Sequence, residues 1–174
     1  MLKSVAGFFQ GIAGSFTTLS SSGLYTPTGG IKGVSTNTNA TAGNVGEYIF
    51  SNVAGNAVSL STGVNSNLTS ISLTAGDWDV SGVVIYNPAA ATSVTLWTQG
   101  TSNVSATNGT AGAYTQIYVG AFVPGAIGQA MATSTYRWSL ASTTTIYLVA
   151  SSNFSISTMT AGGYIGARRV QPGA

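Results

Sequence analysis

Short segments of alternating apolar and polar residues, separated by turn residues, follow one another along the chain from about Asn44 onward. Alternation with a period of two places successive side chains on opposite faces, which is typical of a half-buried β-strand. Turn signals at intervals of about 8–12 residues are typical of sandwiches and barrels. We therefore expect an all-β fold of about eight to ten strands, with no helix longer than a turn after residue 37. The predicted strands are 47–51, 67–74, 77–86, 93–98, 113–122, 134–140, 144–150, 154–157 and 164–170.

The segment 77–86 has the clearest alternation. Its residues Trp78, Val80, Val84 and Tyr86 fall on one face, so we expect Trp78 to be buried. Large apolar residues also fall on the outward faces of predicted strands, and one sheet is therefore expected to be covered by other subunits. These outward residues are Val83, Ile85, Trp97 and Ile117.

Two sandwich types fit such a set of strands, the jelly roll and the immunoglobulin-like sandwich. The predicted number is nearer the roughly eight strands of a jelly roll, and the chain has no cysteine for the Cys-Trp-Cys pattern of an immunoglobulin domain. We therefore predict an antiparallel jelly-roll β-sandwich over residues 38–174, preceded by an extended N-terminal arm.

Residues 1–37 differ from the rest, because they combine Gly and Ser clusters with bunched apolar residues. A lysine, an apolar run and small residues also suggest a signal peptide, but Gln10 and Gly11 interrupt the run. We favour an arm and linker that dock on a partner, since termini stay loose unless they are tied down. The expected virion-anchoring residues are Leu2, Val5, Phe8, Phe9, Ile12 and Phe16.

The chain has five basic and three acidic residues, and it has neither histidine nor cysteine. Ser-His-Asp and Cys-His catalytic arrangements therefore cannot form within one chain, and the usual Cys/His zinc sites are excluded. No basic stripe for nucleic acid and no phosphate-binding glycine motif is present, and the N-terminal segment is too short and Gly-rich to cross a bilayer. We expect a non-enzymatic protein without catalytic residues, cofactor, metal, nucleic acid or membrane partner.

Asp77 and Asp79 are two residues apart on a predicted strand, where paired carboxylates can bind Ca²⁺ or act as acid and base. A Ca²⁺ site needs about 6–8 oxygens, and Glu47 is the one further carboxylate, so we favour a structural role. Only a site shared between subunits would supply enough ligands. Arg168 and Arg169 are adjacent and face opposite sheet surfaces, so one of them is expected to pair with Asp77 or Asp79.

Exposed aromatic residues can serve as stacking platforms for sugars, although most aromatics in a β protein lie in the core or an interface. The alternation in 93–98 places Val94 and Leu96 inward and Trp97 on the other face. Trp97 and Tyr114 both flank loops, and they are the candidate glycan contacts.

Three stretches form recognisable motifs when they are taken together. They are 42–49 (AGNVGEYI), 67–82 with its block Gly-Asp-Trp-Asp-Val-Ser-Gly, and 142–169 near the C-terminus. With these motifs, residues 38–170 resemble a domain of small structural proteins of tailed bacteriophages and prophages, described as fibre or decoration proteins of head or tail. The resemblance implies a trimeric jelly roll in the virion, assembled in the bacterial cytoplasm of the host.

The low net charge means weak self-repulsion, which favours association. The leading hypothesis is a homotrimeric capsid decoration or head fibre protein, held on the major capsid protein by residues 1–37. The alternative is a short tail fibre on a tail or baseplate adaptor that binds a host surface glycan. A free carbohydrate-binding module is a further class, and a depolymerase is disfavoured by the three acidic residues.

Overall fold

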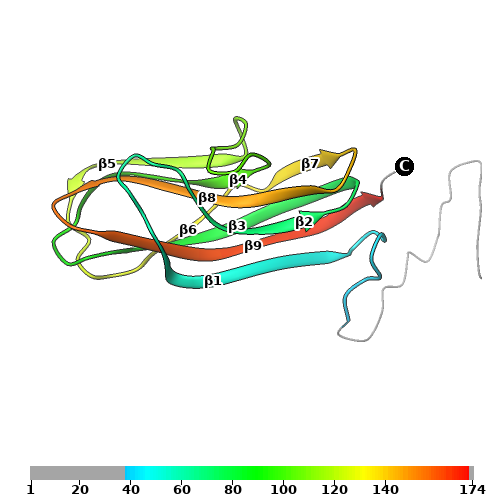
Figure 1. Cartoon of the computed structure of the whole chain (residues 1–174), viewed down its shortest axis with the longest axis horizontal. Coiled ribbons are helices and arrows are strands. Elements are labelled where there is room, and N and C mark those ends of the chain that lie inside the picture. The colour runs from blue at the N-terminus through cyan, green and yellow to red at the C-terminus, as the bar shows by residue number, and fades with distance from the viewer. Residues whose placement is uncertain (1–37, 173–174) are drawn as a thin grey trace, which may run out of the picture. The chain divides into compact units, whose positions relative to one another are not determined.

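The computed structural model describes residues 38–172, which form nine antiparallel strands and no helix (Figure 1). In chain order the strands are β1 (Tyr48–Ser59), β2 (Ser66–Leu73), β3 (Gly76–Pro88), β4 (Ser93–Ser102), β5 (Tyr114–Phe122), β6 (Gln129–Ala132), β7 (Tyr136–Leu140), β8 (Thr144–Ser155) and β9 (Met159–Pro172). The all-β prediction is confirmed for this part of the chain. The predicted arm, residues 1–37, and its anchoring residues lie outside the described residues and stay predictions.

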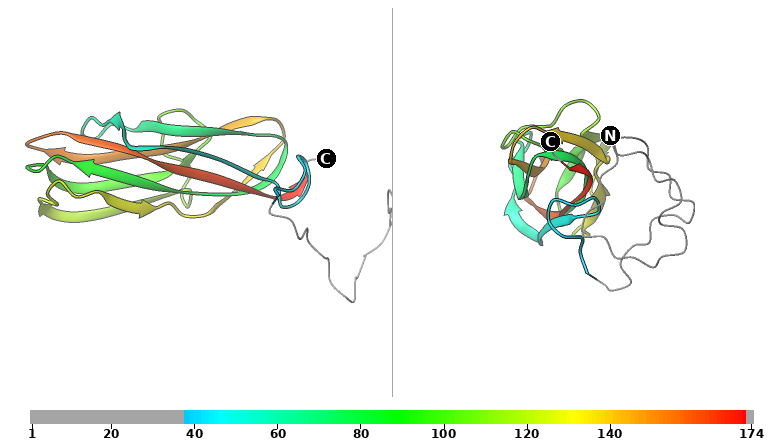
Figure 2. Two further views of the ribbon diagram at one scale, coloured as in Figure 1. Left: turned by 90° about the horizontal axis from the view of Figure 1, so that it is seen from below. Right: turned by 90° about the vertical axis from the view of Figure 1, so that its right-hand side faces the viewer.

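The strands form two sheets with a jelly-roll order. Sheet A runs β1-β9-β3-β6, with β7 also paired to β3, and sheet B runs β2-β8-β4-β5. The first strand pairs with the last and the second with the one before it, so that β1 pairs with β9 and β2 with β8. β6 and β7 pair with opposite halves of β3 and act as one interrupted strand. This winding confirms the predicted jelly roll, and the end-on view in Figure 2 shows the two sheets closing around a common interior.

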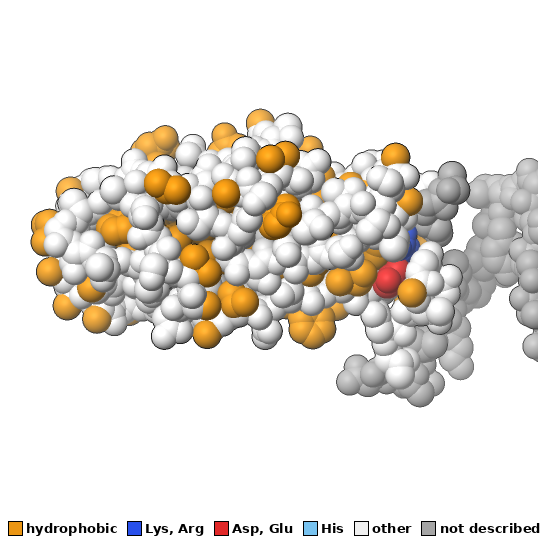
Figure 3. Space-filling view, viewed as in Figure 1, with side chains coloured by type: hydrophobic (Ala, Val, Ile, Leu, Met, Phe, Trp, Pro, Cys, Tyr) orange, Lys and Arg blue, Asp and Glu red, His pale blue; other side chains and the backbone are white. Residues whose placement is uncertain are grey.

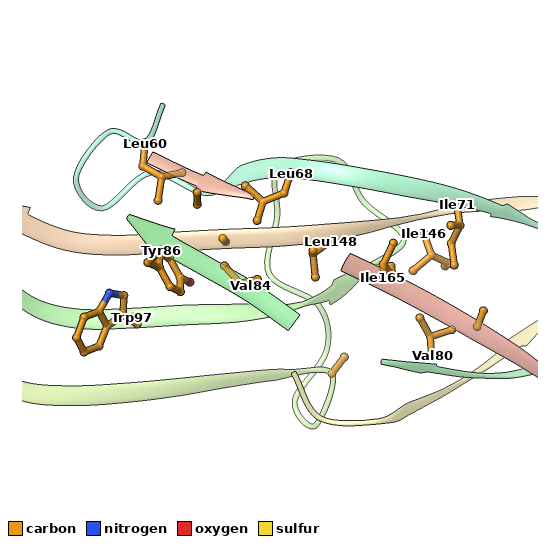
Figure 4. Packing of buried hydrophobic residues seen from close by; sticks show 14 of the residues in the cluster. Leu60, Leu68, Ile71, Val80, Val84, Tyr86, Trp97, Ile146, Leu148 and Ile165 are labelled. Carbon is orange, nitrogen blue, oxygen red and sulfur yellow. The ribbon is translucent and has the colours of Figure 1, made fainter. Parts of the chain in front are cut away.

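β3 supplies the centre of the core, as its alternation predicted. Trp78, Val80, Val84 and Tyr86 are fully buried in one apolar cluster between the sheets. Figure 4 shows the last three of these side chains among their neighbours. The hydroxyl of Tyr86 donates a hydrogen bond of 2.6 Å to the carbonyl oxygen of Thr98 on β4. Burial raises the pKa of Tyr86, so its hydroxyl stays protonated and links sheet A to sheet B.

β4 carries a β-bulge that reverses the predicted orientation of Trp97. The pairing of β4 with both of its neighbours shifts between Val94 and Leu96. One extra residue in a strand moves every later side chain to the other face. Trp97 therefore lies in the core, 2% exposed, with its ring centroid 5.4 Å from that of Phe122 and 6.3 Å from that of Tyr86. The prediction that Trp97 faces outward is wrong.

Candidate functional site

The outer face of sheet A carries a cluster of three aromatic rings from β1 and β9. Along β1, Ile49 and Val53 pack against the core, so the alternate residues Tyr48 and Phe50 point outward. The centroids of these two rings are 6.1 Å apart, and the Phe50 centroid is 6.1 Å from that of Tyr164 on β9. Tyr48 is 40% exposed and Phe50 is 60% exposed, so the cluster is open to solvent.

Glycine at position 166 allows the two tyrosines of this cluster to meet. The hydroxyls of Tyr48 and Tyr164 form a hydrogen bond with each other next to Gly166. A Cβ atom at this position would collide with both hydroxyls. The bond between the hydroxyls fixes the two rings relative to each other on the sheet surface.

A hollow of about 230 Å³ lies beside the aromatic cluster on the same sheet. Gly163 has a φ of +148°, and a Cβ atom there would collide with the carbonyl oxygen of Val83, so the close pairing of β9 with β3 beside the hollow needs glycine at this point. Its lining is mainly apolar and consists of Asn52, Val53, Val83, Ile85, Gly163 and Tyr164. We call the three rings and this hollow the aromatic face.

All charged residues within 38–172 lie on strands of sheet A or directly before β1. They are Glu47, Asp77, Asp79, Arg137, Arg168 and Arg169. The register places Asp79 opposite both Arg137 and Arg168 on its neighbouring strands, so the charges gather at one end of the sheet. Figure 3 shows red and blue side chains at one end only. The strands of sheet B carry no charged residue.

Asp77 and Arg137 form an ion pair at this charged end. The hydrogen bond from Arg137 holds the pKa of Asp77 below its usual range, and a hydrogen bond from Ser139 lowers it further. The Arg137 side chain is 64% exposed and that of Asp77 only 10%, so the pair reaches the surface through its arginine alone. A carboxyl group that stays ionised is a poor general acid, so this arrangement suits a structural contact.

A second ion pair is buried below the same end. The Nε of Arg169 donates a hydrogen bond of 2.9 Å to Oε2 of Glu47, which also accepts one of 2.8 Å from the backbone N–H of Gly43. The guanidinium group donates to the carbonyl oxygen of Ala75 at 2.7 Å and lies 4.1 Å from the centroid of the Trp78 ring. These contacts fasten the turn before β1 and the turn between β2 and β3 onto β9.

The ion pairs differ from the predicted ones. Arg168 is exposed and Arg169 is buried, so they do face opposite sides of the sheet. Among the described residues, neither forms an ion pair with Asp77 or Asp79, because Glu47 takes the buried guanidinium and β7 supplies the partner of Asp77. Within residues 38–172, no three acidic, histidine or cysteine side chains gather as a metal site would need. The same residues contain no helix long and apolar enough to cross a membrane.

The two candidate glycan contacts have different positions. Trp97 is in the core and cannot reach a ligand, so its exposure was wrongly predicted. Tyr114 is half-buried and lies at the start of β5, where glycan binding stays a prediction. The register of β5 on β4 places Tyr114, Gln116 and Tyr118 on the same face, and Tyr118 is 75% exposed. The period-two alternation that marked 113–122 as a strand is the signal that also links Tyr118 to Tyr114.

Comparison with known proteins finds no family model that matches the chain and no curated protein with a matching sequence. Among solved structures, the chain is similar to a chain in the structure of the infectious bursal disease virus Gx strain, with 11% identity and a TM-score of 0.42. It is also similar to the VP2 subviral particle of infectious bursal disease virus, with 12% identity and a TM-score of 0.42. Each match covers 81% of this chain and 38% of the other. The jelly-roll assignment rests on the strand order and not on these matches.

Proposed function

We propose that this protein is a non-enzymatic structural protein of a virus particle and that it works as a homotrimer. The observation that carries the proposal is the aromatic face. This face groups exposed aromatic rings and an apolar hollow on one surface, and grouped exposed apolar residues mark interaction sites. An apolar centre with Tyr and Phe and a charged edge is the usual anatomy of a protein–protein interface. A chain with such a face acts through contact with other subunits.

The few ionisable groups support contact rather than catalysis. Glycosidases use two carboxyl groups whose surroundings separate their pKa values, one being held protonated as the acid. Here Glu47 is bound to Arg169, and the pKa of Asp77 is lowered by Arg137. Neither carboxylate is arranged as a general acid, and we propose no hydrolytic activity.

The motifs in 42–49, 67–82 and 142–169 support a more specific assignment, a capsid decoration or head fibre protein of a tailed phage. In this arrangement, residues 1–37 hold the jelly roll on the major capsid protein through their apolar side chains. The protein is assembled into the virion in the bacterial cytoplasm.

Electron microscopy of virus particles from the host culture tests this function, with gold-labelled antibodies raised against residues 38–174. We expect labels over the capsid. Particles that contain no copy of the chain overturn the structural role, and labels confined to the tail overturn the head assignment.

A tail receptor-binding protein is the second candidate, and the exposed face of β5 favours it. Tyr118 and Tyr114 flank the amide of Gln116 on a sheet without charged residues, which suits an uncharged glycan. A glycan array probed with wild-type protein and with Tyr118→Ala tests this candidate. Binding that is lost in the variant supports it, and an array without any bound glycan overturns it.

A further inference from the structure

We infer that the aromatic face of sheet A is the surface through which copies of this chain associate, so that its occupant is a second copy. This inference rests on the proposed function for the existence of an assembly. It goes further by assigning the contact to the outer face of sheet A and not to sheet B, the arm or the loops.

The residues on this face have the chemistry of an interface centre. Phe50 and Tyr48 expose large parts of their rings, and Val83, in the middle of sheet A, is 36% exposed. Burial of apolar surface stabilises a contact in proportion to the area removed from water. The aromatic cluster is also held in place by the hydrogen bond between Tyr48 and Tyr164. A surface that is already ordered loses little conformational entropy on binding.

The charges at the edge of the face favour a copy of the same chain over a partner of one charge sign. Asp77, Asp79, Arg137 and Arg168 contribute two carboxylates and two guanidinium groups, which cancel. A polyanion such as nucleic acid would be favoured by an excess of positive charge, which this edge does not have. Asp77 is buried and already paired with Arg137, so Asp79 and Arg168 are the exposed charges that can each meet the other sign on neighbouring copies.

The shape of the face also suits association between copies. Phe50 is the most exposed ring of the cluster, and the hollow of about 230 Å³ lies close by on the same face. A projecting ring and an apolar hollow on one surface allow each copy to offer the ring and receive it. A buried aromatic side chain in a pocket is the usual anchor of a protein–protein contact.

Sedimentation of the full chain and of three lysine variants tests the inference. Phe50→Lys and Val83→Lys place a charge on the aromatic face, and Tyr118→Lys places one on a more exposed ring of sheet B. We expect the first two to sediment as a 17.5 kDa species and the third to match the wild-type oligomer. Far-UV circular dichroism confirms that each variant is folded. Folded Phe50→Lys and Val83→Lys that keep the wild-type mass overturn the inference.

Thiol labelling gives a second measurement that does not disturb the contact strongly. The chain has no cysteine, so a single introduced thiol reports on one position. In the oligomer, Asn52→Cys on the aromatic face should react with a maleimide several-fold more slowly than Tyr118→Cys. Equal rates overturn the inference, even if a lysine variant fails to fold.

The outcome for this face can be separated from that of the proposed function. A wild-type chain that sediments at 17.5 kDa overturns the inference and the trimer, while particle labelling still decides the virion role. An oligomer that forms through another surface overturns the inference alone.

Discussion

Replacing Glu47 by glutamine should destabilise the jelly roll strongly, because it leaves the Arg169 charge buried without a counterion. The two side chains are 9% and 2% exposed. Removing one partner of a buried ion pair typically costs about 3–5 kcal/mol. Arg169 keeps its hydrogen bond to Ala75 and its contact with the Trp78 ring, so we expect the lower end, about 3 kcal/mol.

Urea unfolding followed by tryptophan fluorescence measures this change. The Trp78 ring lies 4.1 Å from the Arg169 guanidinium carbon, so its emission reports on the site directly. Protein concentration must be the same for all variants, because association adds to the apparent stability. For a domain of this size, a loss of about 3 kcal/mol lowers Tm by roughly 10 °C.

Asp77→Asn is the matched control, since it breaks the other ion pair with the same carboxylate-to-amide change. Arg137 remains solvated after this substitution because it is 64% exposed, so the loss of stability should be clearly smaller. The two carboxylates are about equally buried, and the arginines differ in exposure. Equal destabilisation by Glu47→Gln and Asp77→Asn would refute the reasoning, since burial of the arginine partner would then make no difference to the value of an ion pair.

Three further predictions concern the core, the pH dependence and the arm. Trp78→Ala should cost about 3–5 kcal/mol and prevent soluble assembly, and a soluble oligomer of this variant in sedimentation contradicts its central role in the core. The pKa of Asp77 is lower in the folded state than its usual value of 3.8, so its stabilising contribution is complete above that pH and is lost as the pH falls through the folded pKa. The gap in unfolding free energy between wild type and Asp77→Asn should therefore be present at pH 7 and close in strong acid, and a constant gap contradicts this. A chain starting at Asn37 should keep its β-type circular dichroism and lose binding to virus particles, whereas unfolding on truncation would show that the arm belongs to the fold.

Local alternation was sufficient to predict the central strand of the fold. In 77–86 the face that holds Trp78, Val80, Val84 and Tyr86 could be assigned from the period of two, and all four side chains are fully buried. This succeeds because β3 lies in the middle of sheet A and is paired on both sides. The alternation of apolar and polar residues along β3 therefore follows directly from the burial of the face that points into the core.

The same argument failed in β4 because a bulge has no clear signal in one sequence. Counting in steps of two from Val94 gives the wrong face for Trp97 once the pairing shifts before Leu96. β6 was not predicted at all, since Gln129–Ala132 has four residues and no run of β-branched or aromatic residues. The segment 154–157 was predicted as a separate strand, but its first two residues continue β8.

The candidate site was the least predictable part, because it joins residues that are far apart in sequence. Tyr48 and Tyr164 are 116 residues apart, and Glu47 and Arg169 are 122 apart. Only the pairing of β1 with β9 brings them together. Single-strand patterns marked Val83 and Ile85 as outward apolar residues, but they could not show that both line one hollow beside an aromatic cluster.

The pairing of β1 with β9 also determines how the domain responds to mechanical force at its N-terminal end. β1 is joined to β9 in two stretches, from Tyr48 opposite Arg168 to Val53 opposite Gly163 and again at Val58 and Ser59, and its hydrogen bonds lie across the strand direction. A pull at residue 38 along the axis of β1, with β9 held near Thr160 at the opposite end of the pairing, loads these bonds side by side, so many must break in the same event. Forced unfolding is governed by the unfolding rate, and such a shear geometry makes that rate low. A protein tethered in this way would therefore keep its fold at forces that separate strand pairs whose hydrogen bonds are loaded one after another.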